Sequence, residues 1–212
     1  MHYEERTFTP SEAAVASGVS LKTVHREIDE GPLRTRRKRS GSKRSLREED
    51  LLYLALAKGL DTKLVQLTSE GKDKLHDAIL VYCGRRGSSK REVRLFGGGL
   101  SLDLKQVLDK VRSRLVQLKR AQRMVVVDSE IRGGEPCIKG TRIGVYEIAN
   151  VLEQGASEDE ILEGYPSLNR TQLELARTFA QAYPRRGRPP RHVWHQPPWR
   201  ELSAGEIHRR GF

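Results

Sequence analysis

The sequence predicts a protein that is mainly α-helical with small β elements. It would be built from an N-terminal winged helix-turn-helix, a long linking helix, a C-terminal trihelical helix-turn-helix-like domain and an extended tail. Two observations support this fold class: helix-capping patterns recur along the chain, and apolar residues follow them at helical spacing. Segments rich in Gly, Pro and basic residues separate the periodic regions. They place the boundaries at residues 1–60, 61–123, 124–183 and 184–212.

Composition favours a polyanionic partner. The 212 residues carry a formal net charge of +11, which points to nucleic acid. A membrane is disfavoured because no apolar run approaches the roughly 18 residues that span a bilayer. The first ten residues lack the apolar stretch of a secretory signal. We therefore expect a bacterial cytoplasmic protein associated with the nucleoid.

Cysteine usage argues against a disulfide framework. Cys83 and Cys137 are far apart and have no His or Cys neighbours at ligand spacing. We therefore expect no metal and no cofactor.

The first module begins with a helix-turn-helix pattern. Thr9 and Glu12 form a capping box around Pro10, and Ser20 caps a second helix that follows a turn at Gly18. We expect a small core between the two helices, made of Val15, Val19, Val24 and Ile28. The residues expected to face DNA from the second helix are Ser20, Lys22, Thr23, His25 and Arg26.

A basic run, RTRRKRSGSKR, follows this pair of helices. Acids at Glu48–Asp50 then suit the start of another apolar helix. A helix-turn-helix followed by a basic hairpin and a helix resembles the DNA-binding head of MerR-type regulators. The run is therefore interpreted as a DNA-contacting wing, the alternative being a solvated loop. The wing residues expected to contact DNA are Arg34, Arg36, Arg37, Lys38, Arg39, Lys43 and Arg44.

The middle segment is less regular. Lys74–Tyr82 is predicted as a helix with Leu75, Ile79 and Leu80 inward, and Glu92–Phe96 as a strand that ends at three glycines. A long helix is predicted from Ser101, with apolar residues alternately four and three apart. This seam serves either as core within the chain or as a dimer contact. Its members are Leu104, Leu108, Val111, Leu115 and Leu118.

A constrained stretch, EIRGGEPCIKGTRI, spans Glu130–Ile143 and follows a predicted strand at Met124–Val127. Its glycines permit positive φ and its proline restricts the backbone, so we expect a β-turn-β element that leads into a helix from Val145. The stretch is either scaffold only, or a site where basic side chains contact phosphate or a partner. Those side chains would be Arg132, Lys139 and Arg142.

The following residues predict three short helices. The first starts at Val145, and capping boxes at Ser157–Glu160 and Asn169–Gln172 start the other two. Together with EIRGGEPCIKGTRI, the region from Val125 to Tyr183 resembles a small helical domain-of-unknown-function family often found in VapB-type antitoxins. Two positions depart from the family pattern, with Ser129 and Gly144 standing where proline is usual.

The segment from Pro184 onward is rich in Pro and Arg and holds both tryptophans of the chain. A disordered segment normally lacks large aromatic residues, so Trp194 and Trp199 are interpreted as anchors in a partner's groove. The alternative is a nonspecific basic tail that strengthens DNA binding. The VapB resemblance implies a ribonuclease toxin, commonly of the PIN-domain (VapC-like) type, as the partner. The residues expected to bind it are Arg185, Arg186, Arg188, Arg191, Trp194, Trp199 and Arg200.

Three function classes follow. The first is a homodimeric antitoxin that represses its own promoter on double-stranded DNA and neutralises the toxin with its tail. The alternative is a stand-alone DNA-binding regulator without a toxin. An enzyme is disfavoured, because the sequence shows no phosphate-binding glycine loop and no nucleophile–base pattern, and we expect no catalytic residues.

Overall fold

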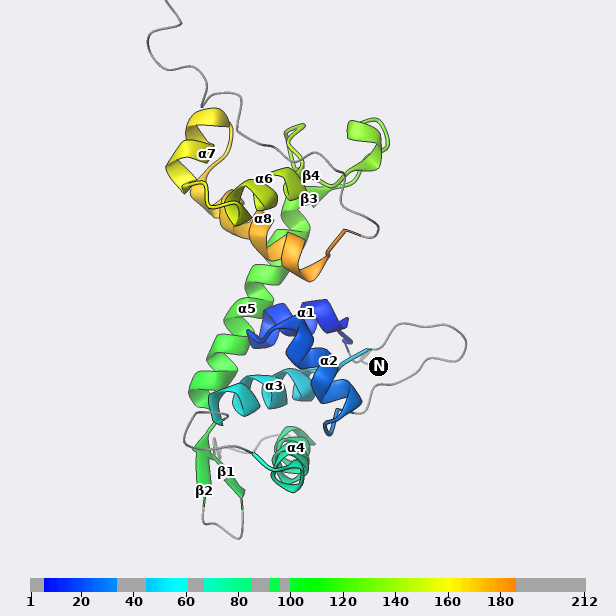
Figure 1. Ribbon diagram of the computed structural model, residues 1–212, viewed down its shortest axis with the longest axis vertical. Coiled ribbons are helices and arrows are strands. Elements are labelled where there is room, and N and C mark those ends of the chain that lie inside the picture. Colours follow the sequence, from blue (N-terminus) through cyan, green and yellow to red (C-terminus); the bar gives the residue numbers. More distant parts are fainter. Residues whose placement is uncertain (1–5, 34–44, 61–66, 85–91, 96–99, 186–212) are drawn as a thin grey trace, which may run out of the picture.

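The computed structural model describes residues 6–33, 45–60, 67–84, 92–95 and 100–185. In these residues the protein is mainly helical, with two small antiparallel sheets. Figure 1 shows an elongated molecule in which one long helix, α5, connects an N-terminal group of helices to a C-terminal group. None of the helices in the described part of the chain has the length and apolar character needed to span a bilayer.

The N-terminal group consists of α1 (Pro10–Ser17), α2 (Leu21–Asp29), α3 (Glu48–Leu60) and α4 (Ser69–Gly84). The predicted caps are confirmed: Thr9 and Glu12 form a capping box at α1, and Ser20 accepts a hydrogen bond from the Thr23 amide at α2. An antiparallel bridge joins Phe8 to Leu46, with backbone hydrogen bonds of 2.8 Å in both directions.

Two predictions of inward-facing residues in this group were wrong. Val15 is only half-buried, because α1 packs through Ala13, Ala16 and its other small residues. Leu80 is 39% exposed, whereas Leu75 and Ile79 are fully buried. Two residues spaced four apart fix the inner face of α4, and Leu80 lies on the next face round the helix.

The linking region contains a hairpin, of which the sequence predicts the first strand but not the second. Strands β1 (Glu92–Leu95) and β2 (Leu100–Asp103) pair antiparallel, with Glu92 opposite Asp103. The predicted helix start at Ser101 was therefore wrong, because that residue lies in β2. Helix α5 (Lys105–Met124) begins four residues later.

The apolar seam of α5 packs inside the chain. Leu104, Val111 and Leu118 are at most 1% exposed, and Leu108 and Leu115 are partly buried against the N-terminal core. Helix α5 contacts α1, α3 and α8. Of the two roles considered for the seam, the structure shows core within the chain.

The C-terminal group follows directly. Strands β3 (Val125–Val126) and β4 (Cys137–Ile138) pair antiparallel around a short 3-10 turn, η2 (Arg132–Gly134). This confirms the predicted β-turn-β element. Helices α6 (Val145–Glu153), α7 (Glu158–Gly164) and α8 (Arg170–Ala182) then enclose a second core around Ile138, Ile148 and Leu173. The predicted capping boxes of α7 and α8 are both present.

Candidate nucleic-acid interface

The turn between α1 and α2 is fixed from two sides. Gly18 ends α1 with a φ of 74°, a left-handed conformation that glycine adopts without strain. Arg114 of α5 donates to the Ser17 carbonyl at 2.9 Å, and Lys58 of α3 donates to the Gly18 carbonyl at 2.5 Å. These two cations satisfy carbonyl groups that the end of a helix leaves open. The start of α2 is thereby held at a set position.

Helix α2 presents its polar side outward. Lys22, His25 and Arg26 are exposed, and Lys22 and Arg26 lie on one face because they are four residues apart. Ser20 and Thr23 lie at the N-terminal end, where their hydroxyl oxygens are 2.8 Å apart. Of the five predicted residues, Ser20, Lys22, His25 and Arg26 are therefore exposed, and Thr23 is half-buried.

The inner side of α2 is anchored by a buried carboxylate. Glu27, 3% exposed, accepts hydrogen bonds from Tyr53 of α3 at 2.7 Å and from Lys72 of α4 at 2.8 Å. Burial, and then the hydrogen bond to Glu27, raise the pKa of the Tyr53 phenol. Arg26 lies 3.6 Å from the same carboxylate, so Glu27 also restrains an outward-facing cation. Sequence reasoning missed Glu27, because a Glu on a short helix is ordinarily a surface residue.

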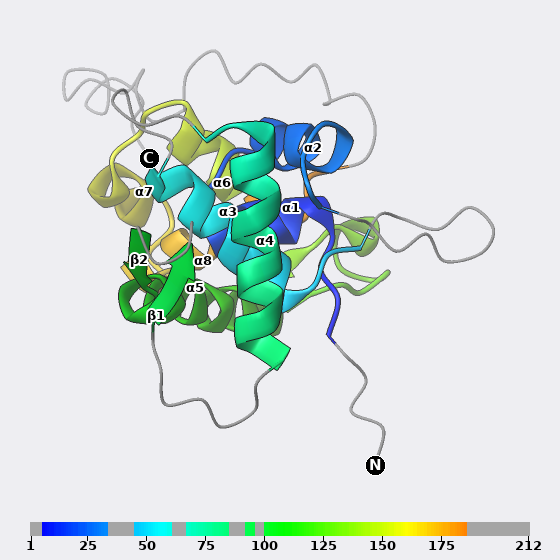
Figure 2. The same cartoon turned by 90° about the horizontal axis from the view of Figure 1, so that it is seen from below.

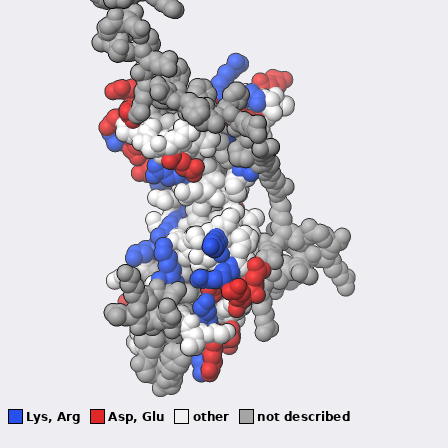
Figure 3. All heavy atoms as spheres, in the orientation of Figure 1, with Lys and Arg blue, Asp and Glu red and all other residues white. Residues whose placement is uncertain are grey.

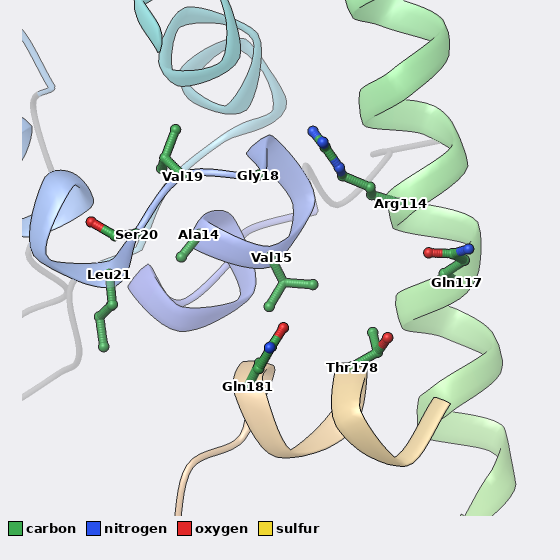
Figure 4. A pocket seen from close by; sticks show the side chains of 10 residues that line it. All are labelled: Ala14, Val15, Gly18, Val19, Ser20, Leu21, Arg114, Gln117, Thr178 and Gln181. Atoms are coloured by element: carbon green, nitrogen blue, oxygen red, sulfur yellow. The ribbon is translucent and has the colours of Figure 1, made fainter. Parts of the chain in front are cut away.

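A pocket of about 520 Å³ lies between the helix-turn-helix and the C-terminal group. Figure 4 shows Arg114 and Gln117 pointing into it from α5, and Thr178 and Gln181 from α8. Val15 and the α1–α2 turn form the opposite wall. A smaller pocket of about 340 Å³ adjoins the inner edge of α2, lined by residues that include Thr23, Arg26 and Glu27.

The basic run predicted as a wing lies outside the described residues, as do most of the predicted toxin-binding residues. The wing residues concerned are Arg34, Arg36, Arg37, Lys38, Arg39, Lys43 and Arg44. The tail residues concerned are Arg186, Arg188, Arg191, Trp194, Trp199 and Arg200. Arg185 is described, at the start of the tail.

The constrained stretch holds an ion-pair network. Arg132 pairs with Glu135 at 3.1 Å and with Glu147 of α6 at 2.6 Å, and Tyr165 donates to Glu147 at 2.8 Å. Burial, and then the hydrogen bond to Glu147, raise the pKa of Tyr165 to about 12. The network ties η2 to α6 and α7, so Arg132 has a scaffold role here. Lys139 and Arg142 are exposed.

The same network reaches the start of the tail. Arg185 forms an ion pair with Glu135, and its guanidinium lies 4.8 Å from the centre of the Tyr146 ring. The Tyr146 hydroxyl donates to the Tyr183 carbonyl at 2.6 Å. These contacts join residues far apart in the chain, and no local sequence pattern predicts them.

Comparison with known proteins agrees with this organisation. Residues 125–180 match the family described as "Protein of unknown function (DUF433)". This confirms the predicted domain-of-unknown-function module over β3 to α8.

The uncharacterized protein y4eO of Sinorhizobium fredii (strain NBRC 101917 / NGR234) is 32% identical over 187 residues. The alignment covers 84% of this chain and 82% of the relative. The chain therefore belongs to the same family as y4eO.

A solved structure is also similar. The crystal structure of Rv2018 from Mycobacterium tuberculosis aligns with 81% of this chain and 96% of its own, at 16% identity and a TM-score of 0.30. A likeness at that level carries no argument about arrangement or function.

Proposed function

We propose that the protein is a DNA-binding antitoxin of the VapB kind. Its MerR-like winged head would bind the promoter of its own operon as a repressor. The tail beyond residue 183 would neutralise a ribonuclease toxin of the PIN type. The four regions 1–60, 61–123, 124–183 and 184–212 would serve as DNA-binding head, linker, antitoxin-associated module and toxin-binding segment.

The observation that carries the DNA-binding part is the exposed face of α2. Lys22, His25 and Arg26 project from a helix whose opposite side is anchored by Glu27, so the backbone that carries them is held in place. Base readout requires side chains presented from a fixed helix in the major groove. Helix α2 would present two long cations, Lys22 and Arg26, to the groove from one face.

The Phe8–Leu46 bridge supports the proposed wing. Leu46 comes two residues after the basic run, and the bridge holds it beside Phe8, two residues before α1. The described residues on either side of the run, Leu33 and Leu46, belong to the same core as Val24 of α2. The arginines and lysines of the run would then contact phosphates beside the groove that α2 reads.

The toxin-binding part is supported by the chemistry of the tail. A PIN-type active site is a cluster of carboxylates that holds divalent metal. An arginine placed there would pair with the carboxylates and compete with metal and RNA phosphate. Arg185 already pairs with a carboxylate of its own chain, Glu135.

A homodimer remains part of the proposal. Two copies of α2 would read half-sites about one helical turn of DNA apart. Since the α5 seam packs within the chain, such a dimer would use another surface.

The DNA-binding part is tested by fluorescence anisotropy on the upstream region of the gene and on a scrambled duplex. Lys22→Ala/Arg26→Ala should reduce the preference for the upstream duplex by about 1–3 kcal/mol per lost base contact. Lys139→Ala/Arg142→Ala, which also removes two exposed cations, is the matched control. Equal affinity of the wild-type chain for both duplexes would refute sequence-specific binding.

The toxin-binding part is tested by removing residues after Tyr183. We expect the truncated chain to keep its binding to the upstream duplex. It should no longer co-purify with a nuclease expressed from the neighbouring gene. If the full chain captures no such nuclease, the stand-alone regulator is the correct class.

A further inference from the structure

Helix α5 carries a concentration of positive charge that its role as a connector does not explain. Its 20 residues include seven Lys or Arg and one Asp, a net charge of +6. Arg114 is used to hold the α1–α2 turn. The other six cations are exposed: Lys105, Lys110, Arg112, Lys119, Arg120 and Arg123.

Four of these cations form a line along the helix. Lys105, Arg112 and Lys119 are each seven residues apart, and Arg123 follows four residues later, so all four project from nearly the same side. At 1.5 Å per residue, the line extends over about 27 Å, with about 10 Å between the first three. In the described part of the chain, no carboxylate pairs with any of the four side chains.

This line, which we name the α5 stripe, lies on a free surface. The seam residues Leu104, Val111 and Leu118 are buried, and the stripe lies about 100° further round the helix, where its four cations are exposed. Figures 1 and 2 show α5 on one flank of the N-terminal group and α2 on the other, with α1 between them. Figure 3 shows Lys and Arg side chains gathered over α5. The stripe is therefore separate from the exposed face of α2.

We propose that the α5 stripe is a second nucleic-acid surface, which contacts the phosphate backbone of double-stranded DNA independently of α2. Duplex DNA carries one negative charge per about 1.7 Å of its axis, so a 27 Å line of cations faces phosphates along its whole length. Long, flexible cations spaced along a helix suit backbone contact without base readout.

Charge and apolar content favour nucleic acid over an acidic protein. A protein interface normally has an apolar, well-packed centre. On the exposed side of α5, Val116 is the large apolar residue, half exposed amid polar and charged neighbours. The stripe presents positive charges spread along the helix and has no apolar patch. A polyanion requires such an arrangement of charge.

The inference rests on the proposed function only in taking DNA as the polyanion. It implies that the chain contacts DNA on two flanks, so that one molecule would bend a duplex around its N-terminal group or join two duplex segments. Contacts through α2 would then supply sequence preference, and contacts through the stripe would supply salt-dependent affinity.

The test is the salt dependence of binding by the full chain to a random-sequence duplex of about 30 base pairs, long enough to exceed α5. The stripe variant is Arg112→Gln/Lys119→Gln/Arg123→Gln. The control variant is Lys74→Gln/Arg170→Gln/Arg177→Gln, which removes three exposed cations from other elements. Glutamine has a helix propensity close to those of Arg and Lys, so α5 should stay folded, which circular dichroism verifies.

We expect the slope of log affinity against log salt to become shallower by about 2 to 3 in the stripe variant, since each phosphate contact contributes about 0.9. The control should keep the wild-type slope. If the triple variant unfolds, Arg112→Gln alone should still reduce the slope by about 0.9. An unchanged slope in the stripe variant, or an equal change in both variants, would overturn the α5 stripe.

Two further outcomes separate this inference from the proposed function. If the stripe variant keeps its DNA slope but loses affinity for poly-L-glutamate, the surface takes acidic protein and the inference is wrong. If the stripe variant keeps the wild-type salt dependence while Lys22→Ala/Arg26→Ala loses sequence preference, the inference fails and the DNA-binding function stands. If the wild-type chain binds no duplex at low salt, both fail together.

Discussion

Tyr183 donates a hydrogen bond of 2.6 Å to Glu12, a residue 171 positions earlier in the chain. The other carboxylate oxygen of Glu12 accepts the Thr9 amide at 2.8 Å and completes the capping box of α1. Gln122 of α5 donates to the same Tyr183 hydroxyl. The end of α8 is thus held against α1, the first helix of the N-terminal group.

Removing this hydrogen bond should destabilise the protein. We expect Tyr183→Phe to lower the free energy of unfolding by about 1 kcal/mol, the typical net worth of one hydrogen bond. A double-mutant cycle with Glu12→Gln in urea unfolding should return a coupling energy of about 0.5 kcal/mol or more. Simple additivity of the two substitutions would mean that the contact contributes nothing to stability.

Alkaline pH should weaken the fold through two tyrosines. Burial, and then a carboxylate hydrogen bond, raise the pKa of Tyr53 and of Tyr183 in the folded state. Each phenol therefore stays protonated to higher pH when folded than when unfolded. This contribution to stability is complete below about pH 10, the ordinary tyrosine pKa, and is lost as the pH rises above it.

The measurement is urea unfolding at pH 8 and at pH 11. Tyr53→Phe should reduce the decrease in the free energy of unfolding between pH 8 and pH 11. Tyr82→Phe is the control, because the Tyr82 hydroxyl has no hydrogen-bond partner among the described residues. If both variants show the wild-type pH dependence, Tyr53 does not contribute to the loss of stability at alkaline pH.

A side chain at Gly18 should displace Arg114. Its φ is 74°, and an added Cβ would meet the Arg114 guanidinium at 2.5 Å. Gly155 also has a positive φ, of 90°, but nothing lies within 4 Å of an added Cβ there. Gly18→Ala should therefore lower the free energy of unfolding by about 1 kcal/mol more than Gly155→Ala does, because it displaces the Arg114 hydrogen bond. In an Arg114→Ala background the two costs should converge in thermal unfolding.

Glu27 should be needed both for stability and for the position of α2. Glu27→Ala leaves the buried Tyr53 hydroxyl without its acceptor and should cost about 2–3 kcal/mol. Glu27→Gln keeps an acceptor and should cost less. Glu30→Gln, at the exposed end of α2, serves as the control and should have no measurable effect. If Glu30→Gln lowers the free energy of unfolding as much as Glu27→Gln does, the charge on α2 stabilises the fold, and the buried contact does not.

Local features of this fold follow from the sequence. The caps at Thr9, Ser20, Ser157 and Asn169 involve residues three apart, so a single motif contains both partners. The outward positions of Lys22 and Arg26 follow in the same way from helical periodicity once the cap at Ser20 is known.

Other features depend on contacts that no local motif contains. The seam that begins at Leu104 predicts a helix from Ser101, but the pairing of Ser101–Asp103 with β1 makes these residues a strand. The buried role of Glu27 depends on α3 and α4, and the pairing of Arg185 with Glu135 depends on the fold of the whole C-terminal group. Propensity and periodicity carry no information about such partners.

The central claim is that α2 reads DNA sequence, and in vitro selection from a random duplex library tests it most directly. The full chain and Lys22→Ala/Thr23→Ala/Arg26→Ala would be selected in parallel at the same salt concentration. We predict that the wild-type chain enriches a defined motif, and that the variant enriches a motif degenerate at the base pairs that these side chains contact. Recovery of the same motif with both proteins, or of no motif with the wild-type chain, would contradict the assignment of α2 as the reading helix.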